Sequence, residues 1–203
     1  MLIPFLKLFD KYNLNITGIL HVGAHECEEI HDYENKIPRS KILWVEAIPG
    51  KVTYCTNSFE NLLIENAVVS DKQDDVVTFH VTNNGQSSSL LELGEHKLYY
   101  PHIYFVYEFE AKTKRLDNLL EKYDTVYNFL NMDIQGTELL ALKGLGKYLD
   151  NFDYIYTEVN TSEIYLGCAK LSDIDDFLQK HNFKRAELSL TDANWGDAFY
   201  IKI

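Results

Sequence analysis

The stretch Thr17-Gly-Ile-Leu-His-Val-Gly-Ala-His-Glu-Cys-Glu-Glu29 decides the fold of this chain. Its apolar, β-favouring part ends at Val22, turns on Gly23-Ala24 and continues as a polar segment that can open a helix. A strand that feeds a tight turn of small residues is the place where α/β folds receive a nucleotide-like ligand. We therefore place the first half of a binding site at this turn.

A second apolar strand, Ile42-Leu-Trp-Val45, ends on an acidic residue, Glu46. A carboxylate at the tip of the second strand can accept hydrogen bonds from both hydroxyls of a ribose. Gly23 and Glu46 together therefore predict an adenosine site. The turn lacks a full G-x-G-x-x-G pattern, which counts against a dinucleotide.

Length and composition are those of one globular domain, expected over residues 1–203. The 203 residues are 46% hydrophobic and 25% charged, and their net charge is −12. That charge argues against a nucleic-acid partner, which requires a basic face, and it repels anionic membranes. Three scattered cysteines, an N-terminus without a basic leader and the absence of a long apolar run predict a cytoplasmic protein.

Strands at 17–22, 41–46 and 62–69 follow a first helix over Ile3–Tyr12, and helical segments separate them. This alternation predicts a parallel sheet with right-handed crossovers. The same pattern resumes later, with helices expected at Arg115–Lys122, Thr137–Leu149 and Leu171–His181, and strands at Val126–Met132, Asp153–Glu158, Phe183–Leu190 and Asp197–Ile203.

The last two strands are joined only by residues 191–196, which is too short for a parallel crossover. They should therefore pair antiparallel. The expected fold class is α/β, a Rossmann-like methyltransferase fold. Its mostly parallel central sheet is closed by an antiparallel C-terminal strand and has helices on both faces.

An insertion at about 76–112 interrupts the alternation. Val76–Val81 and Ile103–Phe109 look like two strands that extend one edge of the sheet. The polar loop Gly85–Leu90 between them can fold over a site, and Ser88 and Ser89 are its candidate substrate contacts. For the aromatic run Tyr99–Tyr107, strand core is favoured over a sugar pocket.

Six motifs in order resemble the FkbM family of S-adenosylmethionine-dependent methyltransferases. They are His-Val-Gly-Ala-His-Glu-Cys-Glu-Glu (21–29), Trp-Val-Glu-Ala-Ile-Pro (44–49), Asn-Ala-Val-Val-Ser-Asp (66–71), Thr-Lys-Arg-Leu-Asp-Asn-Leu-Leu (113–120), Asn-Met-Asp-Ile-Gln-Gly-Thr-Glu-Leu-Leu-Ala-Leu-Lys-Gly (131–144) and Tyr-Thr-Glu-Val (156–159). The resemblance implies methyl transfer to an oxygen, often a hydroxyl of a sugar, polysaccharide or secondary metabolite.

The resemblance also assigns the cofactor residues. S-adenosylmethionine is expected to lie against His21, Gly23, Ala24, Glu46, Ala47, Asn66 and Ala67. Asn66 and Ala67 end the third strand, where such folds contact the adenine. Two positions depart from the family pattern: His21 replaces the usual acidic residue, and Cys27 replaces the second glycine of the turn.

Asp133 is the first candidate for catalysis because it follows a nearly continuous apolar strand and faces the crevice at the strand ends. It can orient the donor's ammonium group, hold the acceptor hydroxyl or remove its proton. A plainer role as helix N-cap, shared with Thr137, stays open. His25 and Glu158 are the next candidates.

A metal is not favoured. His21, His25, Cys27 and His31 match no zinc signature. Asp133, Glu158 and Asn160 are oxygen ligands at neighbouring strand ends that would suit Mg²⁺, and this remains the one metal hypothesis.

Two other functions remain open. His21 and Cys27 keep a non-catalytic protein of the same fold possible, and Gly23 with Glu46 would also suit an NAD-dependent oxidoreductase. The expected partner is a small-molecule or glycan acceptor, and oligomeric state is left open.

Overall fold

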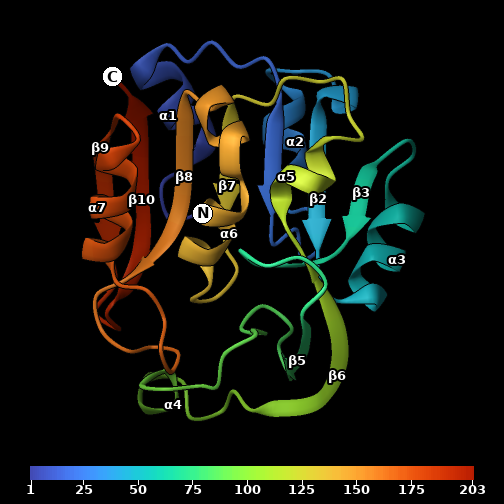
Figure 1. The fold of residues 1–203 in the computed structure, drawn as a ribbon, viewed down its shortest axis with the longest axis vertical. Coiled ribbons are helices and arrows are strands. Elements are labelled where there is room, and N and C mark those ends of the chain that lie inside the picture. The colour runs from blue at the N-terminus through green and yellow to red at the C-terminus, as the bar shows by residue number, and fades with distance from the viewer.

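The computed structural model describes residues 1–203 as a central sheet between two layers of helices, with a smaller sheet at one end (Figure 1). The central sheet has seven strands in the order β3-β2-β1-β7-β8-β10-β9. They are β1 (Ile19–Val22), β2 (Ile42–Glu46), β3 (Leu63–Asn66), β7 (Phe129–Met132), β8 (Tyr154–Asn160), β9 (Phe183–Leu190) and β10 (Trp195–Lys202).

The strands β3, β2, β1, β7 and β8 pair in parallel, as the alternation predicts. β10 pairs antiparallel with both β8 and β9, so the expected antiparallel hairpin is confirmed. β10 lies between β8 and β9 rather than at the edge of the sheet. The fold class predicted from the sequence is therefore the one observed.

Helices cover both faces because the central strands β1, β2 and β7 are buried on both sides. On one face, α1 (Phe5–Tyr12), α2 (Ile30–Glu34) and α3 (Pro49–Ser58) enclose a core around Trp44 and Phe129. On the other, α5 (Leu116–Leu120), α6 (Glu138–Gly144) and α7 (Leu171–Lys180) pack on Leu20, Leu130 and Ile155.

One predicted helix and one predicted strand are each divided into two elements in the structure. The helix expected over 137–149 ends at Gly144, and a 3-10 helix, Gly146–Asn151, continues from it. Gly146 has φ +50, which interrupts the regular α-helix. The strand expected over 62–69 also breaks, because the chain turns after Asn66 and β4 (Val68–Val69) leaves the central sheet.

The insertion forms a sheet of its own, so its expected addition to the edge of the central sheet is wrong. β5 (Val76–Thr82) and β6 (Phe105–Lys114) pair antiparallel, and β4 pairs in parallel with the end of β6. The short helix α4 (His96–Tyr99) lies between β5 and β6 in the chain. Figure 1 shows this sheet and α4 beyond the arrowheads of β1, β2 and β3, at the carboxyl ends of the parallel strands.

The core expectation for the aromatic run 99–107 is wrong for three of its tyrosines. Tyr99, Tyr104 and Tyr107 are 39%, 59% and 50% exposed. No helix of the structure combines the length and the apolarity that crossing a bilayer requires.

Candidate active site

A crevice runs along the carboxyl ends of the parallel strands and has two compartments. The inner one encloses about 550 Å³ and the outer one about 1390 Å³, both including space open to solvent. Five residues line both compartments and mark where they join: Gly23, His25, Gln86, Asp133 and Gln135. The turn after β1 and the end of β7 therefore meet at the centre of the site.

Gly23 allows these two ends to come together. It has φ +90, and a Cβ on it would lie 1.8 Å from the carbonyl oxygen of Asp133. The Asp133 N–H donates to the carbonyl of Val22 at 3.0 Å, while the Gly23 N–H donates to Val45 at 2.9 Å. The glycine is thus required by the packing of the backbone of β7 against the turn.

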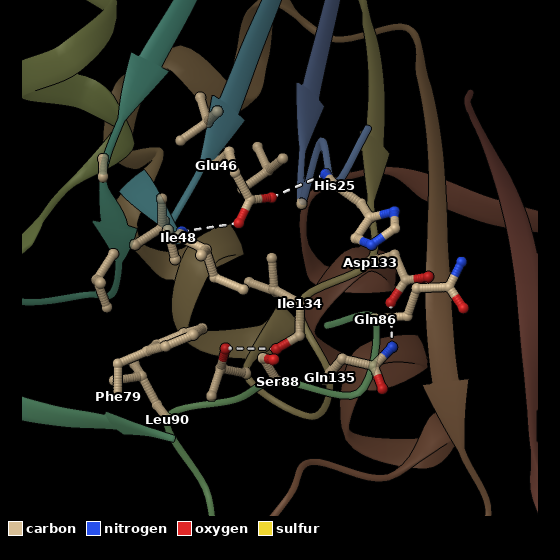
Figure 2. Close-up of a pocket in the computed structure, with 18 of the residues that line it drawn as sticks. His25, Glu46, Ile48, Phe79, Gln86, Ser88, Leu90, Asp133, Ile134 and Gln135 are labelled. Carbon is tan, nitrogen blue, oxygen red and sulfur yellow. Dashed lines mark hydrogen bonds between the residues drawn. The ribbon is translucent and has the colours of Figure 1, made fainter. Parts of the chain in front are cut away.

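Glu46 stands at the tip of β2 with a fixed orientation and is only 6% exposed. One carboxylate oxygen accepts the N–H of His25 and the other the N–H of Ile48, both at 2.8 Å (Figure 2). Burial raises the pKa of Glu46, and the two N–H groups oppose this shift by stabilising the charged form. Each oxygen keeps a lone pair that can accept a hydroxyl hydrogen from the inner compartment.

The other residues predicted to bind the cofactor divide into two groups. Ala47 and Ala67 line the inner compartment. Ala24 and Asn66 do not: Ala24 is buried in the core, and the Asn66 side chain donates to the carbonyls of Glu46 and Ala47 at 2.9 and 3.0 Å. Asn66 therefore holds the strand tip that presents Glu46.

Apolar side chains from both sheets form the rest of the inner wall. Ile48, Phe79, Leu90 and Ile134 line it. A slot with apolar walls and a single buried carboxylate at one end matches the two ends of an adenosine, a flat base and a ribose.

The serine loop closes this wall from the side of the insertion. Ser88 lines the inner compartment and accepts the N–H of Thr82 at 3.0 Å. Ser89 is fully buried, and its hydroxyl donates to the carbonyl of Gln135 at 2.7 Å. Ser89 therefore anchors the loop to the strand-end turn, and its side chain does not line the crevice.

His21 and Cys27, the two departures from the family pattern, lie outside the inner compartment. His21 is 3% exposed, stacks on Trp44 with ring centroids 4.5 Å apart, and has its Nδ1 3.1 Å from the hydroxyl of Tyr33. Burial lowers the pKa of His21 and so favours a neutral ring. Cys27 is fully buried with φ +58, a left-handed conformation that explains why a glycine is usual there.

Gln135 links two of the predicted catalytic carboxylates, Asp133 and Glu158. Its side-chain nitrogen donates to Asp133 Oδ1 and to Glu158 Oε2, the latter at 2.8 Å. Its side-chain oxygen accepts the hydroxyl of Tyr165, and its backbone has φ +57. A non-glycine residue with a positive φ is strained, and hydrogen bonds with three side chains hold Gln135 in this conformation. Such strain is typical of functional sites.

Glu138 adds a third carboxyl that sequence reasoning missed. Carboxylate oxygens of Asp133, Glu138 and Glu158 all lie within 4.8 Å of one another. Glu138 accepts the N–H groups of Ile134 and Gly136 at 3.0 and 3.1 Å. Glu138 is thus the residue that satisfies these N–H groups, and neither Asp133 nor Thr137 caps α6 with its side chain.

The crowding of these carboxyls changes their acidity. Burial, reinforced by neighbouring carboxylates, raises the pKa of Glu158 well above its usual range and that of Glu138 to about 7. The pKa of Asp133, which is open to the crevice, is also raised, first by limited hydration and then by Asp197. The site therefore holds groups that can take up a proton near neutral pH.

His25 faces both compartments from the turn after β1. Its backbone has φ +45, its Nδ1 lies 2.5 Å from Glu28, and its buried Nε2 has no hydrogen-bond partner. An orphaned nitrogen at the junction of the two compartments is available for a bound molecule.

A mostly parallel sheet with an inserted antiparallel strand, and a carboxylate at the tip of its second strand, define the class of Rossmann-like methyltransferases. Within this class the chain belongs to the FkbM methyltransferase family, whose description is "Methyltransferase FkbM domain" and which matches residues 21–185. The resemblance drawn from the six motifs is thereby confirmed.

The chain is also similar to other known proteins in sequence or in fold. The chain is 24% identical over 175 residues to the 2-O-methyltransferase NoeI of Sinorhizobium fredii, covering 79% of this chain and 70% of that protein. It is similar in fold to the magnesium protoporphyrin IX methyltransferase of Synechocystis PCC 6803 with bound SAM, with a TM-score of 0.53, 9% identity, and 97% and 74% of the two chains covered. An S-adenosylmethionine-dependent methyltransferase from Clostridium acetobutylicum ATCC 824 gives a TM-score of 0.54 at 6% identity, with 97% and 88% covered.

Proposed function

We propose that this methyltransferase uses S-adenosylmethionine to methylate a hydroxyl group of a sugar, polysaccharide or secondary metabolite. The observation that carries the proposal is Glu46, a buried carboxylate that two N–H groups aim into an apolar slot. Support for oxygen as the acceptor atom comes from the relative NoeI, which is named as a 2-O-methyltransferase. That the acceptor is not a nucleic acid and that the protein is cytoplasmic remain predictions.

The inner compartment fits the adenosine half of the cofactor. Glu46 accepts the ribose hydroxyls, and Ile48, Phe79 and Leu90 enclose the base. Gly23, His25 and Asp133 then face the remaining half of the cofactor, because they line both compartments. When bound, S-adenosylmethionine supplies an electrophilic methyl group on a positively charged sulfur.

The chain's own chemical task is to position the acceptor and to take up the proton of its hydroxyl. An alcohol is a weak nucleophile, and a positioned base contributes about 10²–10⁴-fold to such a reaction. Asp133 is the first candidate, because it lies at the junction of the compartments with a raised pKa and with Gln135 fixing its orientation. Glu158 shares the same amide group, and His25 lies across the junction from both.

The two alternatives have less support. Of the two residues that raised a non-catalytic role, Cys27 is packed in the core on the α1–α3 side of the sheet, and His21 stacks on Trp44 and lines the outer compartment. Membership of a methyltransferase family favours methyl transfer over NAD-dependent oxidation.

The proposal is tested by incubating the protein with methyl-labelled S-adenosylmethionine and a panel of hydroxyl-bearing acceptors. We expect label in one acceptor class, and we expect Asp133→Asn to lower kcat by about 10²–10⁴-fold while cofactor affinity stays within a few fold. Asp124→Asn, an exposed aspartate remote from the crevice, is the matched control. Cofactor binding without transfer to any acceptor would favour the non-catalytic alternative, and undiminished kcat in Asp133→Asn would remove this residue from the mechanism.

A further inference from the structure

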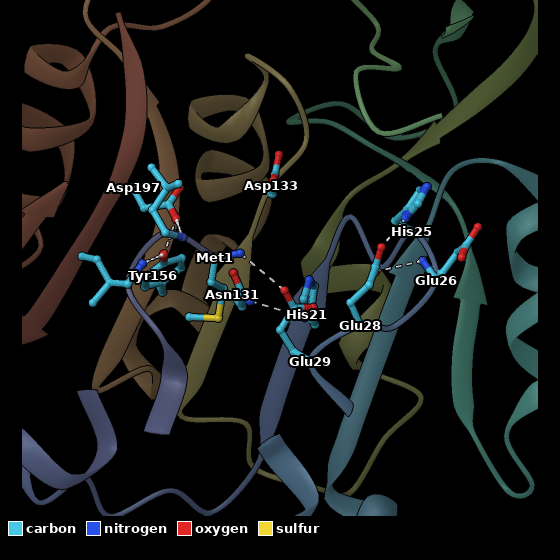
Figure 3. A network of polar contacts seen from close by, with 12 residues as sticks. Met1, His21, His25, Glu26, Glu28, Glu29, Asn131, Asp133, Tyr156 and Asp197 are labelled. Carbon is cyan, nitrogen blue, oxygen red and sulfur yellow. Dashed lines mark hydrogen bonds and ion pairs between the residues drawn. The ribbon is translucent and has the colours of Figure 1, made fainter. Parts of the chain in front are cut away.

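The outer compartment is strongly acidic. Its lining includes five carboxylate side chains and no lysine or arginine. Figure 3 shows Glu28, Glu29, Asp133 and Asp197 among the polar contacts of this region. The carboxylates are those of Glu28, Glu29, Asp133, Glu158 and Asp197. The one ammonium group among the lining residues is the amino terminus at Met1, which lies 3.5 Å from Glu29.

Neutral groups hold most of these carboxylates in place. Asp197 accepts the N–H of Leu2 at 2.5 Å and the hydroxyl of Tyr156, and Glu158 accepts the amide of Gln135. Such hydrogen bonds fix the orientation of a carboxylate but leave its charge uncompensated. Glu28 differs from these, because it lies 2.5 Å from Nδ1 of His25. Burial first and neighbouring carboxylates second raise the pKa of Glu158, so this carboxyl favours its neutral form.

Aromatic side chains also line the outer compartment. Trp195 donates its Nε1–H to the hydroxyl of Tyr100 at 2.9 Å, and His96 and Tyr165 line the same compartment. His96 is only 5% exposed, and its Nδ1 has no hydrogen-bond partner. Aromatic faces stack on sugar rings and attract cations, and an unpartnered buried nitrogen is available for a polar group of the bound molecule.

From this combination we infer that the acceptor is a sugar that carries a free amino group, and that the outer compartment excludes anionic acceptors. Carboxylates in a compartment that is also lined by aromatic rings can pair with an ammonium group while the sugar ring stacks, whereas a phosphate or a uronic acid meets like charge. The inference rests on the proposed function for the reaction itself, but the recognition of the amine is independent of it.

The cofactor alone does not account for so much negative charge. S-adenosylmethionine carries a sulfonium and an ammonium group, and its own carboxylate cancels one of them. Of the five carboxylates only Asp133 lines both compartments, so Glu28, Glu29, Glu158 and Asp197 face the outer one alone. Burial raises the pKa of Glu158 and Asp197 and so favours their neutral forms, and a cationic acceptor would therefore meet mainly the charges of Glu28 and Glu29.

The test compares the binding of three small probes to the whole chain, without cofactor, by calorimetry. The probes are the methyl glycosides of glucosamine, N-acetylglucosamine and glucuronic acid, which differ in charge on a similar ring. We expect the amine to bind at least tenfold more tightly than its N-acetyl form, with a preference that weakens at high salt, and the glucuronide not to bind. Equal affinity for the amine and the N-acetyl form, tight binding of the glucuronide, or binding of none of the three would each overturn the inference.

A variant that removes one negative charge tests whether the outer compartment causes the preference for the amine. Glu29→Gln should weaken binding of the amine roughly threefold to tenfold and leave the N-acetyl form unchanged, because only the former senses the lost charge. Glu121→Gln, an exposed glutamate remote from the crevice, is the control. Cofactor binding to the same samples separates the two claims. A protein that prefers the amine but binds no S-adenosylmethionine contradicts the proposed function and leaves this inference standing.

Discussion

Gln135 is the residue on which the geometry of the catalytic carboxylates depends. Its amide donates to both Asp133 and Glu158, and the hydroxyl of Tyr165 holds its other end. The donated hydrogen bond stabilises ionised Asp133 and so lowers a pKa that burial and Asp197 raise. Gln135 thus acts as a positioning residue that keeps Asp133 able to accept a proton.

Replacing Gln135 should therefore change the pH dependence of catalysis. In Gln135→Ala the pKa of Asp133 rises, so the ascending limb of kcat against pH should move to higher pH, while folding is retained. Gln135→Asn, which tolerates the left-handed backbone but is too short to bridge both carboxylates, should shift it in the same direction. A loss of activity at all pH values with an unmoved limb would assign Gln135 a purely structural role.

The same group of residues bears on whether methyl transfer needs a metal ion. The amide of Gln135 already lies between Asp133 and Glu158, and Glu138 is engaged by two backbone N–H groups. We expect methyl transfer to continue in excess EDTA, and added Mg²⁺ to change kcat by less than about twofold. Activity abolished by EDTA and restored by Mg²⁺ would instead support a metal at these carboxylates.

Sequence patterns located the site residues along the chain better than they gave the direction of each side chain. Glu46, Ala47 and Ala67, predicted to bind the cofactor, line the inner compartment, whereas the side chain of Asn66, one residue before Ala67, turns back to the tip of β2. A strand end can present its side chain to either side, and only the tertiary contacts decide. Gln135 was quoted only as part of a motif, because its role depends on Tyr165, which is remote in sequence.

At the scale of elements, the meeting of β1 and β7 forms the site. The turn after β1 passes so close to Asp133 that only glycine fits at position 23. This contact opens the crevice at the point where the chain moves from one side of β1 to the other.

Gly23→Ala should therefore be strongly destabilising, by about 3 kcal/mol or more, because the added methyl group meets the backbone of β7 and the φ of +90 disfavours alanine. Gly50→Ala is the control, since a Cβ on this residue in α3 meets nothing within 4 Å. Urea unfolding of both variants measures the difference. Equal stability of the two variants would contradict the close approach.

The parallel part of the central sheet was predictable because short apolar runs alternate with helical segments, and the hairpin of β9 and β10 because its connection is short. The second sheet was not, because it depends on the two-residue strand β4 pairing with Thr113 and Lys114, more than forty residues later in the chain. Such a pairing has no local signature, and the insertion was for this reason expected at the edge of the central sheet.

At the scale of the whole molecule, the buried carboxyls connect the site to stability. The pKa of Glu138 is about 7 in the folded chain against 4.5 for the free side chain. Between these values the folded protein keeps a proton that the unfolded chain has lost, so this residue's contribution to the free energy of unfolding falls as pH rises and levels off above pH 7.

The variant Glu138→Gln keeps an oxygen that can accept the two N–H groups but has no carboxyl that ionises. Its stability relative to the natural protein should increase between pH 4.5 and pH 7, by up to roughly 3 kcal/mol. Burial lowers the pKa of His21 and His96, so these residues make both proteins more stable as pH rises. The free energy of unfolding in urea should therefore be compared between the two proteins at each pH, because this difference removes the shared contribution of the histidines. A difference that is constant with pH would show that Glu138 ionises normally in the folded chain.

The most direct test of the account is the binding of S-adenosylmethionine and S-adenosylhomocysteine by calorimetry to the natural protein, Glu46→Gln and Asn66→Ala. The account predicts binding to the natural protein and at least a tenfold loss in Glu46→Gln, because a hydrogen bond to a charged group contributes about 1.5–3 kcal/mol. Asn66→Ala, which loosens the same strand tip but keeps the carboxylate, should lose much less. Absence of binding to the natural protein, or equal affinity in Glu46→Gln, would contradict the assignment of the inner compartment to the cofactor.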